Sequence, residues 1–203
     1  MNARRWGIIA LIAVGVVVLA GVVAATGNGR DNSGERVSPS RWADDSCGSV
    51  GAWEGQLEAI RDELSRDNYG ARRNDGGSGD IVEARLTIRV AVDRAILATT
   101  DVLQEGLKRA GIPDVGKGEE ASLTLRNWAQ QTEHNLRVAK QVLKEKPPST
   151  SQAFGALRAP VDALTLSVVQ GRAAFSHVTG LDPALGDALD GSRNCRDLMK
   201  EQP

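Results

Sequence analysis

Cys47 and Cys195 are the two cysteines of this 203-residue chain, and a pair of thiols can form a disulfide, bind a metal or carry out redox chemistry. The two lack a CxxC spacing and neighbouring histidines, which disfavours a zinc site or a thioredoxin-like site. In an exported protein, as the N-terminal segment predicts this one to be, such a pair most often forms a disulfide. A Cys47–Cys195 bridge would stabilise the fold by roughly 5 kcal/mol.

Metal chemistry by histidine is disfavoured by the residues around His134 and His177. A di-iron helical bundle needs the motif Glu-x-x-His, but Gln131 and Ala174 occupy the positions three residues before the two histidines. The sequence also contains no HExxH motif. We therefore expect two ordinary surface or half-buried histidines, and we predict no metal and no cofactor.

Phosphate binding and nucleophilic catalysis also lack their motifs. Residues 116–119 read Gly-Lys-Gly-Glu, whereas a P-loop requires Gly-x-x-x-x-Gly-Lys followed by Ser or Thr, after a strand. No Gly-x-Ser-x-Gly elbow occurs. Carboxylates such as Glu54 and Glu58 lie near Arg61, a spacing typical of ion pairs on a solvated helix face. We predict that the protein is not an enzyme.

The segment Trp6–Ala25 carries no charge and consists mainly of Ile, Val, Leu, Ala and Gly. Twenty residues span roughly 30 Å as a helix, about the thickness of the hydrocarbon core of a bilayer. Arg4 and Arg5 precede this segment, and the positive-inside rule keeps them in the cytoplasm. Residues 1–26 are thus predicted to be a single-pass membrane anchor that contacts the lipid bilayer through residues 6–25, with the C-terminal domain outside the cytoplasm.

A cleaved secretory signal is the alternative, because residues 23–25 read Val-Ala-Ala and offer a cleavage site of small residues. The apolar core of a signal usually runs only about 7 to 15 residues, which favours a retained anchor. A lipoprotein is disfavoured because no cysteine closely follows the apolar run. With either reading, the bulk of the chain leaves the cytoplasm.

The exported part carries a slightly negative charge. Without Arg4 and Arg5, 23 Lys and Arg residues stand against 26 Asp and Glu residues, a net charge of −3. A nucleic-acid binder would show a basic face or stripe. We therefore predict no nucleic-acid partner.

Residues 27–45 are rich in Gly, Asn, Ser, Arg and Asp and predict a flexible spacer before a domain at 46–203. Apolar residues at steps of three and four then predict amphipathic helices that carry Trp53 and Trp128 in the core. Trp42 is expected to pack near Cys47, to touch the membrane surface or to contact a partner. The expected helices cover about 46–65, 80–110, 119–144 and 154–175, and a short fifth helix follows Asp182-Pro183.

Helix punctuation supports these bounds. Gly111-Ile112-Pro113 is predicted to end the second helix. Pro160 is expected to kink the fourth helix or to mark its start. No strand-like alternation of useful length occurs. The predicted fold class is all-α: an antiparallel four-helix bundle with a short fifth C-terminal helix, after an N-terminal transmembrane helix. An up-down-up-down order places Cys47 and Cys195 at the same pole.

Three stretches together carry a resemblance: Ser46–Trp53, Ala110–Glu120 with its Gly-x-Pro-x-Val hinge, and Asn194–Leu198. With them, the chain resembles a group of uncharacterised small secreted or membrane-tethered helical proteins of actinobacteria that share an early and a late cysteine. The resemblance covers about residues 46–199. It implies export and paired cysteines, and it implies no activity, cofactor or catalytic residue.

These observations favour a non-enzymatic binding or interaction module at the outer face of the membrane, with a cell-envelope or membrane-protein partner. A sensory ectodomain that acts through a separate membrane partner is the alternative, because helical bundles beside membranes often serve as sensors. The chain contains no second apolar segment of membrane-spanning length, so such a sensor would depend on that partner.

Overall fold

The computed structural model describes residues 34–71, 78–144 and 150–200, which belong to one compact unit, Ser33–Pro203. The predicted membrane anchor at residues 6–25 lies outside the described residues. Of the helices in the described ranges, none combines the length and the apolar character needed to span a bilayer.

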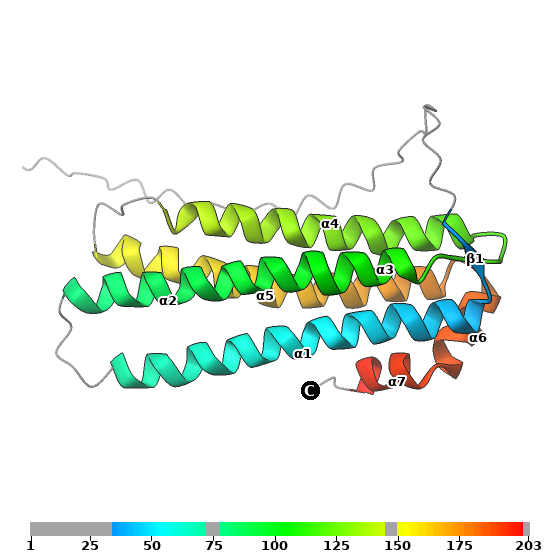
Figure 1. The fold of residues 1–203 in the computed structure, drawn as a ribbon, viewed down its shortest axis with the longest axis horizontal. Coiled ribbons are helices and arrows are strands. Elements are labelled where there is room, and N and C mark those ends of the chain that lie inside the picture. Colours follow the sequence, from blue (N-terminus) through cyan, green and yellow to red (C-terminus); the bar gives the residue numbers. More distant parts are fainter. Residues whose placement is uncertain (1–33, 72–77, 145–149, 201–203) are drawn as a thin grey trace, which may run out of the picture. The chain divides into compact units, whose positions relative to one another are not determined.

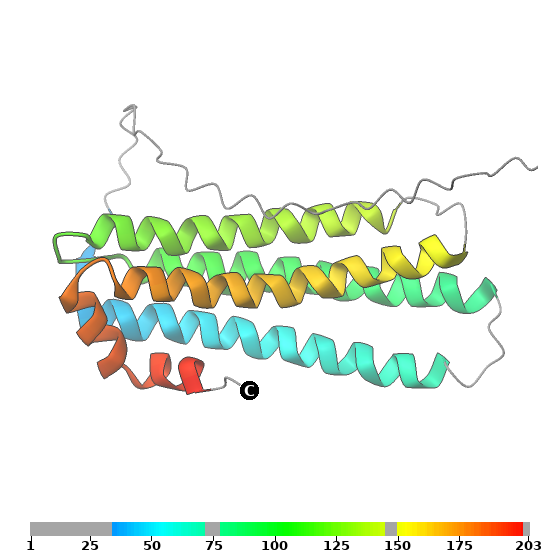
Figure 2. The same ribbon diagram turned by 180° about the vertical axis from the view of Figure 1, so that it is seen from behind.

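Helices make up most of the described residues, which confirms the predicted all-α class. The four long helical segments α1, α2–η1–α3, α4 and α5 lie side by side and alternate in direction, and α6 and α7 pack along α1 (Figures 1 and 2). The elements are β1 (Arg36–Val37), α1 (Pro39–Ala71), α2 (Ser78–Leu97), the π-helix η1 (Ala98–Gln104), α3 (Glu105–Arg109), β2 (Ile112–Pro113), α4 (Gly118–Val142), α5 (Thr150–Thr179), α6 (Pro183–Gly191) and α7 (Arg193–Lys200).

The first helix begins at Pro39, earlier than the predicted start near residue 46. The Ser38 hydroxyl accepts a hydrogen bond from the backbone N–H of Arg41 at 3.4 Å, and proline occupies the first helical position. This is a helix N-cap followed by its preferred first residue. Trp42 is 1% exposed, in agreement with the expectation that it packs on the domain. The predicted spacer at 27–45 was therefore wrong after Ser38, where the residues form the start of α1 and contribute Trp42 to the core.

A short N-terminal strand lies against the connection between α3 and α4. β1 and β2 pair in parallel, and the backbone N–H groups of Ile112 and Asp114 donate to the carbonyls of Glu35 and Val37 at 3.0 and 2.8 Å. Gly111 ends the helix before this connection, as predicted, with a φ of 78°. A Cβ there would lie 2.5 Å from the Glu35 carbonyl oxygen, so both the conformation and the space require glycine.

Three aromatic rings connect three helices inside the domain. The Trp53 and Trp128 rings meet edge to face with centroids 5.6 Å apart, and Phe175 meets Trp128 at 6.5 Å. Trp128 lies on α5 where Gly171 has no side chain, and its indole N–H donates to the Ser167 carbonyl at 3.1 Å. The predicted core positions of the two tryptophans are therefore confirmed.

The segment that was expected to be one helix, 80–110, contains the π-helix η1 in its middle. The Thr99 and Thr100 hydroxyls donate to the carbonyls four residues earlier, at 2.8 and 2.6 Å, and such bonds compete with the backbone ladder of an α-helix. The N–H of Glu105 donates to the Thr100 carbonyl, five residues back. The Thr99 hydroxyl also accepts a hydrogen bond from the indole N–H of Trp53 at 3.0 Å. The widened turn therefore supplies an acceptor for the buried donor of this tryptophan.

A half-buried carboxylate joins η1 to α4. Gln104 donates its side-chain amide to Glu133 at 2.7 Å, and Arg137 donates to Glu133 at 2.6 Å. These interactions, the Gln104 hydrogen bond first and the Arg137 hydrogen bond second, lower the pKa of the Glu133 carboxyl below its ordinary value of 4.5.

Pro160 lies inside α5, which continues on both sides of it, so this proline does not mark the start of the helix. The predicted start at Asp182-Pro183 is confirmed, because the Asp182 carboxylate accepts the N–H of Ala184 at 2.9 Å. One expected fifth helix is instead two, α6 and α7, which are separated at Ser192.

Gly171→Ala is expected to destabilise the protein, because the new Cβ would lie 2.4 Å from the Trp128 ring. Overpacking of this kind costs about 1–3 kcal/mol, which outweighs the gain in helix propensity. Gly55→Ala is the matched control, since it is also helical and has no atom within 4 Å of the added Cβ. Urea unfolding followed by tryptophan fluorescence measures both. Equal effects of the two substitutions would contradict the packing described.

Glu133→Gln is expected to lower the free energy of unfolding at pH 7 by about 1 kcal/mol. The folded-state pKa of Glu133 is lowered, so its contribution is present above the unfolded-state value of 4.5 and is lost as pH falls through the folded-state value. The variant should therefore lose less stability than the wild type between pH 7 and pH 3. Glu58→Gln removes an exposed ion pair with Arg61 and should change stability by less than about 0.5 kcal/mol.

Candidate functional site

The structure brings the two cysteines together. The sulfur atoms of Cys47 and Cys195 lie 2.04 Å apart, a disulfide bond, with their Cα atoms 5.0 Å apart. Cys47 lies in α1 and Cys195 in α7, and both are buried, with exposed fractions of 1% and 2%. The predicted pairing is therefore present, and it ties the C-terminal segment to the first helix.

Hydrogen bonds around the disulfide orient the same segment. The Ser192 hydroxyl donates to the Asp44 carboxylate at 2.6 Å, and the Asn194 amide donates to the Asp44 carbonyl at 3.1 Å. Ser192 lies at the break between α6 and α7, and its hydroxyl also accepts the N–H of Cys195 at 3.3 Å. These contacts let the chain turn at Ser192 and return along α1.

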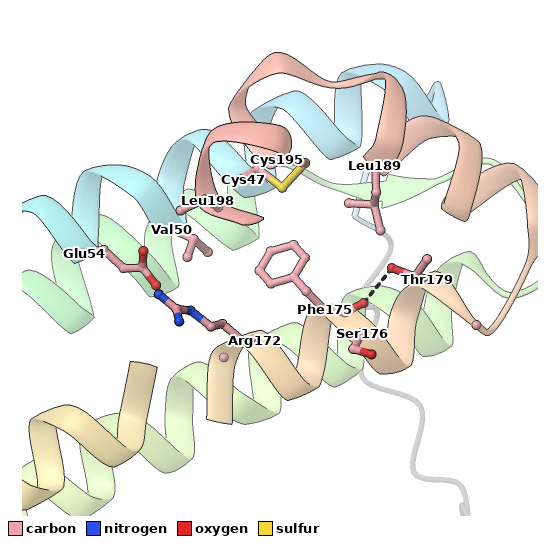
Figure 3. A pocket seen from close by; sticks show the side chains of 12 residues that line it. Cys47, Val50, Glu54, Arg172, Phe175, Ser176, Thr179, Leu189, Cys195 and Leu198 are labelled. Atoms are coloured by element: carbon pink, nitrogen blue, oxygen red, sulfur yellow. Dashed lines mark hydrogen bonds between the residues drawn. A yellow bond between two sulfur atoms is a disulfide. The ribbon is translucent and has the colours of Figure 1, made fainter. Parts of the chain in front are cut away.

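A cavity of about 500 Å³ lies between α1, α5 and the two C-terminal helices (Figure 3). This volume is typical of small-molecule sites. The α1 wall carries residues 47, 50 and 54, at steps of three and four, and the opposite wall is the α5 face that begins at Gly171. The lining residues are Cys47, Val50, Glu54, Gly171, Arg172, Phe175, Ser176, Thr179, Gly180, Leu189, Cys195 and Leu198.

The walls are mainly apolar, and two opposite charges lie together at one end. Phe175, Val50 and Leu198 face the interior, whereas Glu54 and Arg172 turn their charged ends toward one another (Figure 3). The Nε atom of Arg172 is buried and has no hydrogen-bond partner among the described residues. A buried donor without a partner costs free energy, so an acceptor on a ligand would be favourable at this atom.

The cavity offers few polar groups to a ligand. Its two hydroxyls are those of Ser176 and Thr179, and Thr179 donates to the Phe175 carbonyl at 2.9 Å. Among the described lining residues no base stands beside a hydroxyl in the manner of a nucleophile–base pair. Apolar walls with few polar groups are typical of ligand pockets.

The other residues considered in the sequence lie elsewhere. His134 in α4 and His177 in α5 are exposed and line no part of this cavity. Within the described ranges, no group of three or more His, Cys, Asp or Glu residues is arranged to hold a metal ion. In the Gly-Lys-Gly-Glu stretch, Lys117 donates to Glu120 at 2.9 Å, and this contact raises the pKa of the lysine and lowers that of the glutamate.

The cavity itself was not predicted from the sequence. A usable signal existed in α5, where Arg172 follows Gly171 at the turn between Val168 and Phe175 of the apolar stripe. A charged residue beside a core stripe indicates a wet or ligand-facing edge of the helix. That α7 faces this edge depends on the return at Ser192, which has no periodic signature.

No protein family, curated protein or solved structure matches this chain.

Cys195→Ala and Cys47→Ala are each expected to lower the free energy of unfolding by about 2–5 kcal/mol. The double variant should lose no more than either single variant, because both remove the same cross-link. Urea unfolding of the full chain without reductant measures the loss. Reductant should bring the wild type to the stability of the variants; a wild type that is insensitive to reductant and equal to the variants would refute the role of the bond.

Proposed function

We propose that this protein is a non-enzymatic binding module, held at the outer face of the membrane, that takes a small molecule into the cavity between α1, α5 and the C-terminal helices. The observation that carries the proposal is the cavity itself: about 500 Å³, mainly apolar, with one buried arginine N–H donor in its wall that has no hydrogen-bond partner among the described residues. Pockets of this size and lining commonly hold small ligands.

Export is the part of the proposal that rests on sequence. The apolar segment at residues 6–25 supports a membrane anchor, and a buried disulfide is the state expected of paired cysteines in an oxidising compartment. In this proposal the helices α1 to α5 form an antiparallel bundle outside the cytoplasm, and the disulfide holds its C-terminal cover in place. The net charge of −3 outside the anchor supports a partner other than nucleic acid.

A photoreactive neutral probe tests the binding function. Octanol that carries a diazirine on its alkyl chain is added to the full chain in phosphatidylcholine vesicles, and labelled peptides are identified by mass spectrometry after irradiation. We expect saturable labelling at Val50, Phe175 or Leu198. Leu198→Trp should fill the cavity and abolish this label, because the larger side chain occupies the space of the probe.

Leu166→Trp is the matched control, since Leu166 is 50% exposed on α5 and does not line the cavity. This variant should keep the label of the wild type. Labelling spread evenly over exposed apolar residues, or labelling that Leu198→Trp leaves unchanged, would contradict the proposal.

A further inference from the structure

We propose that the ligand is a single-chain amphiphile with a terminal carboxylate, whose apolar chain fills the cavity and whose carboxylate binds Arg172. This inference rests on the proposed binding function and adds the chemical class of the ligand. It follows from three features of the cavity: the length of its α5 wall, the unsatisfied Nε atom of Arg172 and the position of Glu54.

The cavity lies along one helix. Its α5 wall runs from Gly171 to Thr179, roughly 12 Å along a helix axis. Leu189, Leu198 and the disulfide cover it from the C-terminal side. An elongated, flexible chain fits a groove of this length, and each methylene that leaves water for such walls adds about 0.8 kcal/mol of binding free energy.

Arg172 selects the head group. Among the described residues, the Nε atom of its guanidinium lies buried without a hydrogen-bond acceptor. A guanidinium offers parallel N–H donors that match the two oxygens of a carboxylate. A bound carboxylate would therefore satisfy a donor that is otherwise left unpaired in a poorly solvated position, which is the strongest kind of polar contact available here.

Glu54 lies at the same end and opposes an anionic head group. It is the other charged residue among the described residues that line the cavity, and it has an interaction of its own. Its charge weakens the attraction between Arg172 and a ligand carboxylate. The two residues must therefore act with opposite signs: loss of the Arg172 charge weakens binding of the amphiphile, and loss of the Glu54 charge strengthens it.

The test compares matched photoreactive probes on the full chain in phosphatidylcholine vesicles at pH 7. Octanoate, octanol and octylamine carry the same diazirine, and the concentration that half-saturates the cavity label is measured for each. On the wild type, octanoate should bind more tightly than octanol or octylamine. Arg172→Gln should weaken the binding of octanoate by about tenfold and leave the binding of octanol unchanged. Glu54→Gln should strengthen the binding of octanoate.

Arg193→Gln is the control, because Arg193 is exposed on α7 and does not line the cavity. This substitution should leave the half-saturating concentrations of all three probes unchanged. Tighter binding of octylamine than of octanoate, equal binding of octanoate and octanol, or weaker octanoate binding in Glu54→Gln would overturn the inference and leave the binding function standing. Absence of cavity labelling by all three probes would instead remove the binding function. The wild-type comparison decides the inference even where a variant does not fold.

Discussion

The bond between Cys47 and Cys195 is the constraint on which the cavity depends. Helix α7 has only eight residues, and a helix of that length has little stability of its own in water. The disulfide fixes it to α1, and the hydrogen bonds from Ser192 and Asn194 to Asp44 fix its direction. Leu198 can form a wall of the cavity only because this short segment is held in place.

The interior of the domain supplies the opposite wall. Trp128 packs against α5 at Gly171, and its indole N–H donates to the Ser167 carbonyl, so two contacts fix this side of α5 against α4. Phe175 touches Trp128 on one side and lines the cavity on the other. The floor of the cavity is therefore the edge of the aromatic core, a close-packed region that resists collapse into the empty space.

Much of the fold was predictable because residues close together in the sequence indicate where a helix begins, ends and faces the core. The apolar spacing that placed Trp53 and Trp128 in the core, the Asp182-Pro183 start and the Gly111 end all reflect interactions within a few residues. Ser38-Pro39 carries the same local signal, a capping residue followed by proline, at the true start of α1. The polar composition of residues 27–45 predicted a spacer there instead. A compositional signal is weaker than a cap.

The site was harder to predict, since it depends on contacts between distant parts of the chain. The pairing of Cys47 with Cys195 followed from the count of cysteines, but the cavity beside it depends on where α7 turns. The sequence analysis did not single out Arg172, and only the packing of the elements around it shows that its Nε is enclosed. Residue spacing places a charged residue beside the apolar stripe of α5, but it does not show which other elements enclose that residue.

Hydrogen–deuterium exchange of the full chain, with the cysteines oxidised and then reduced, tests most directly whether the disulfide holds the cavity cover in place. The account predicts that reduction raises exchange sharply in α6 and α7, over residues 183–200, while α4 and the aromatic core around Trp128 stay protected. Unchanged protection of residues 183–200 after reduction would contradict it, as would thiols that are already free and reactive in protein isolated without reductant.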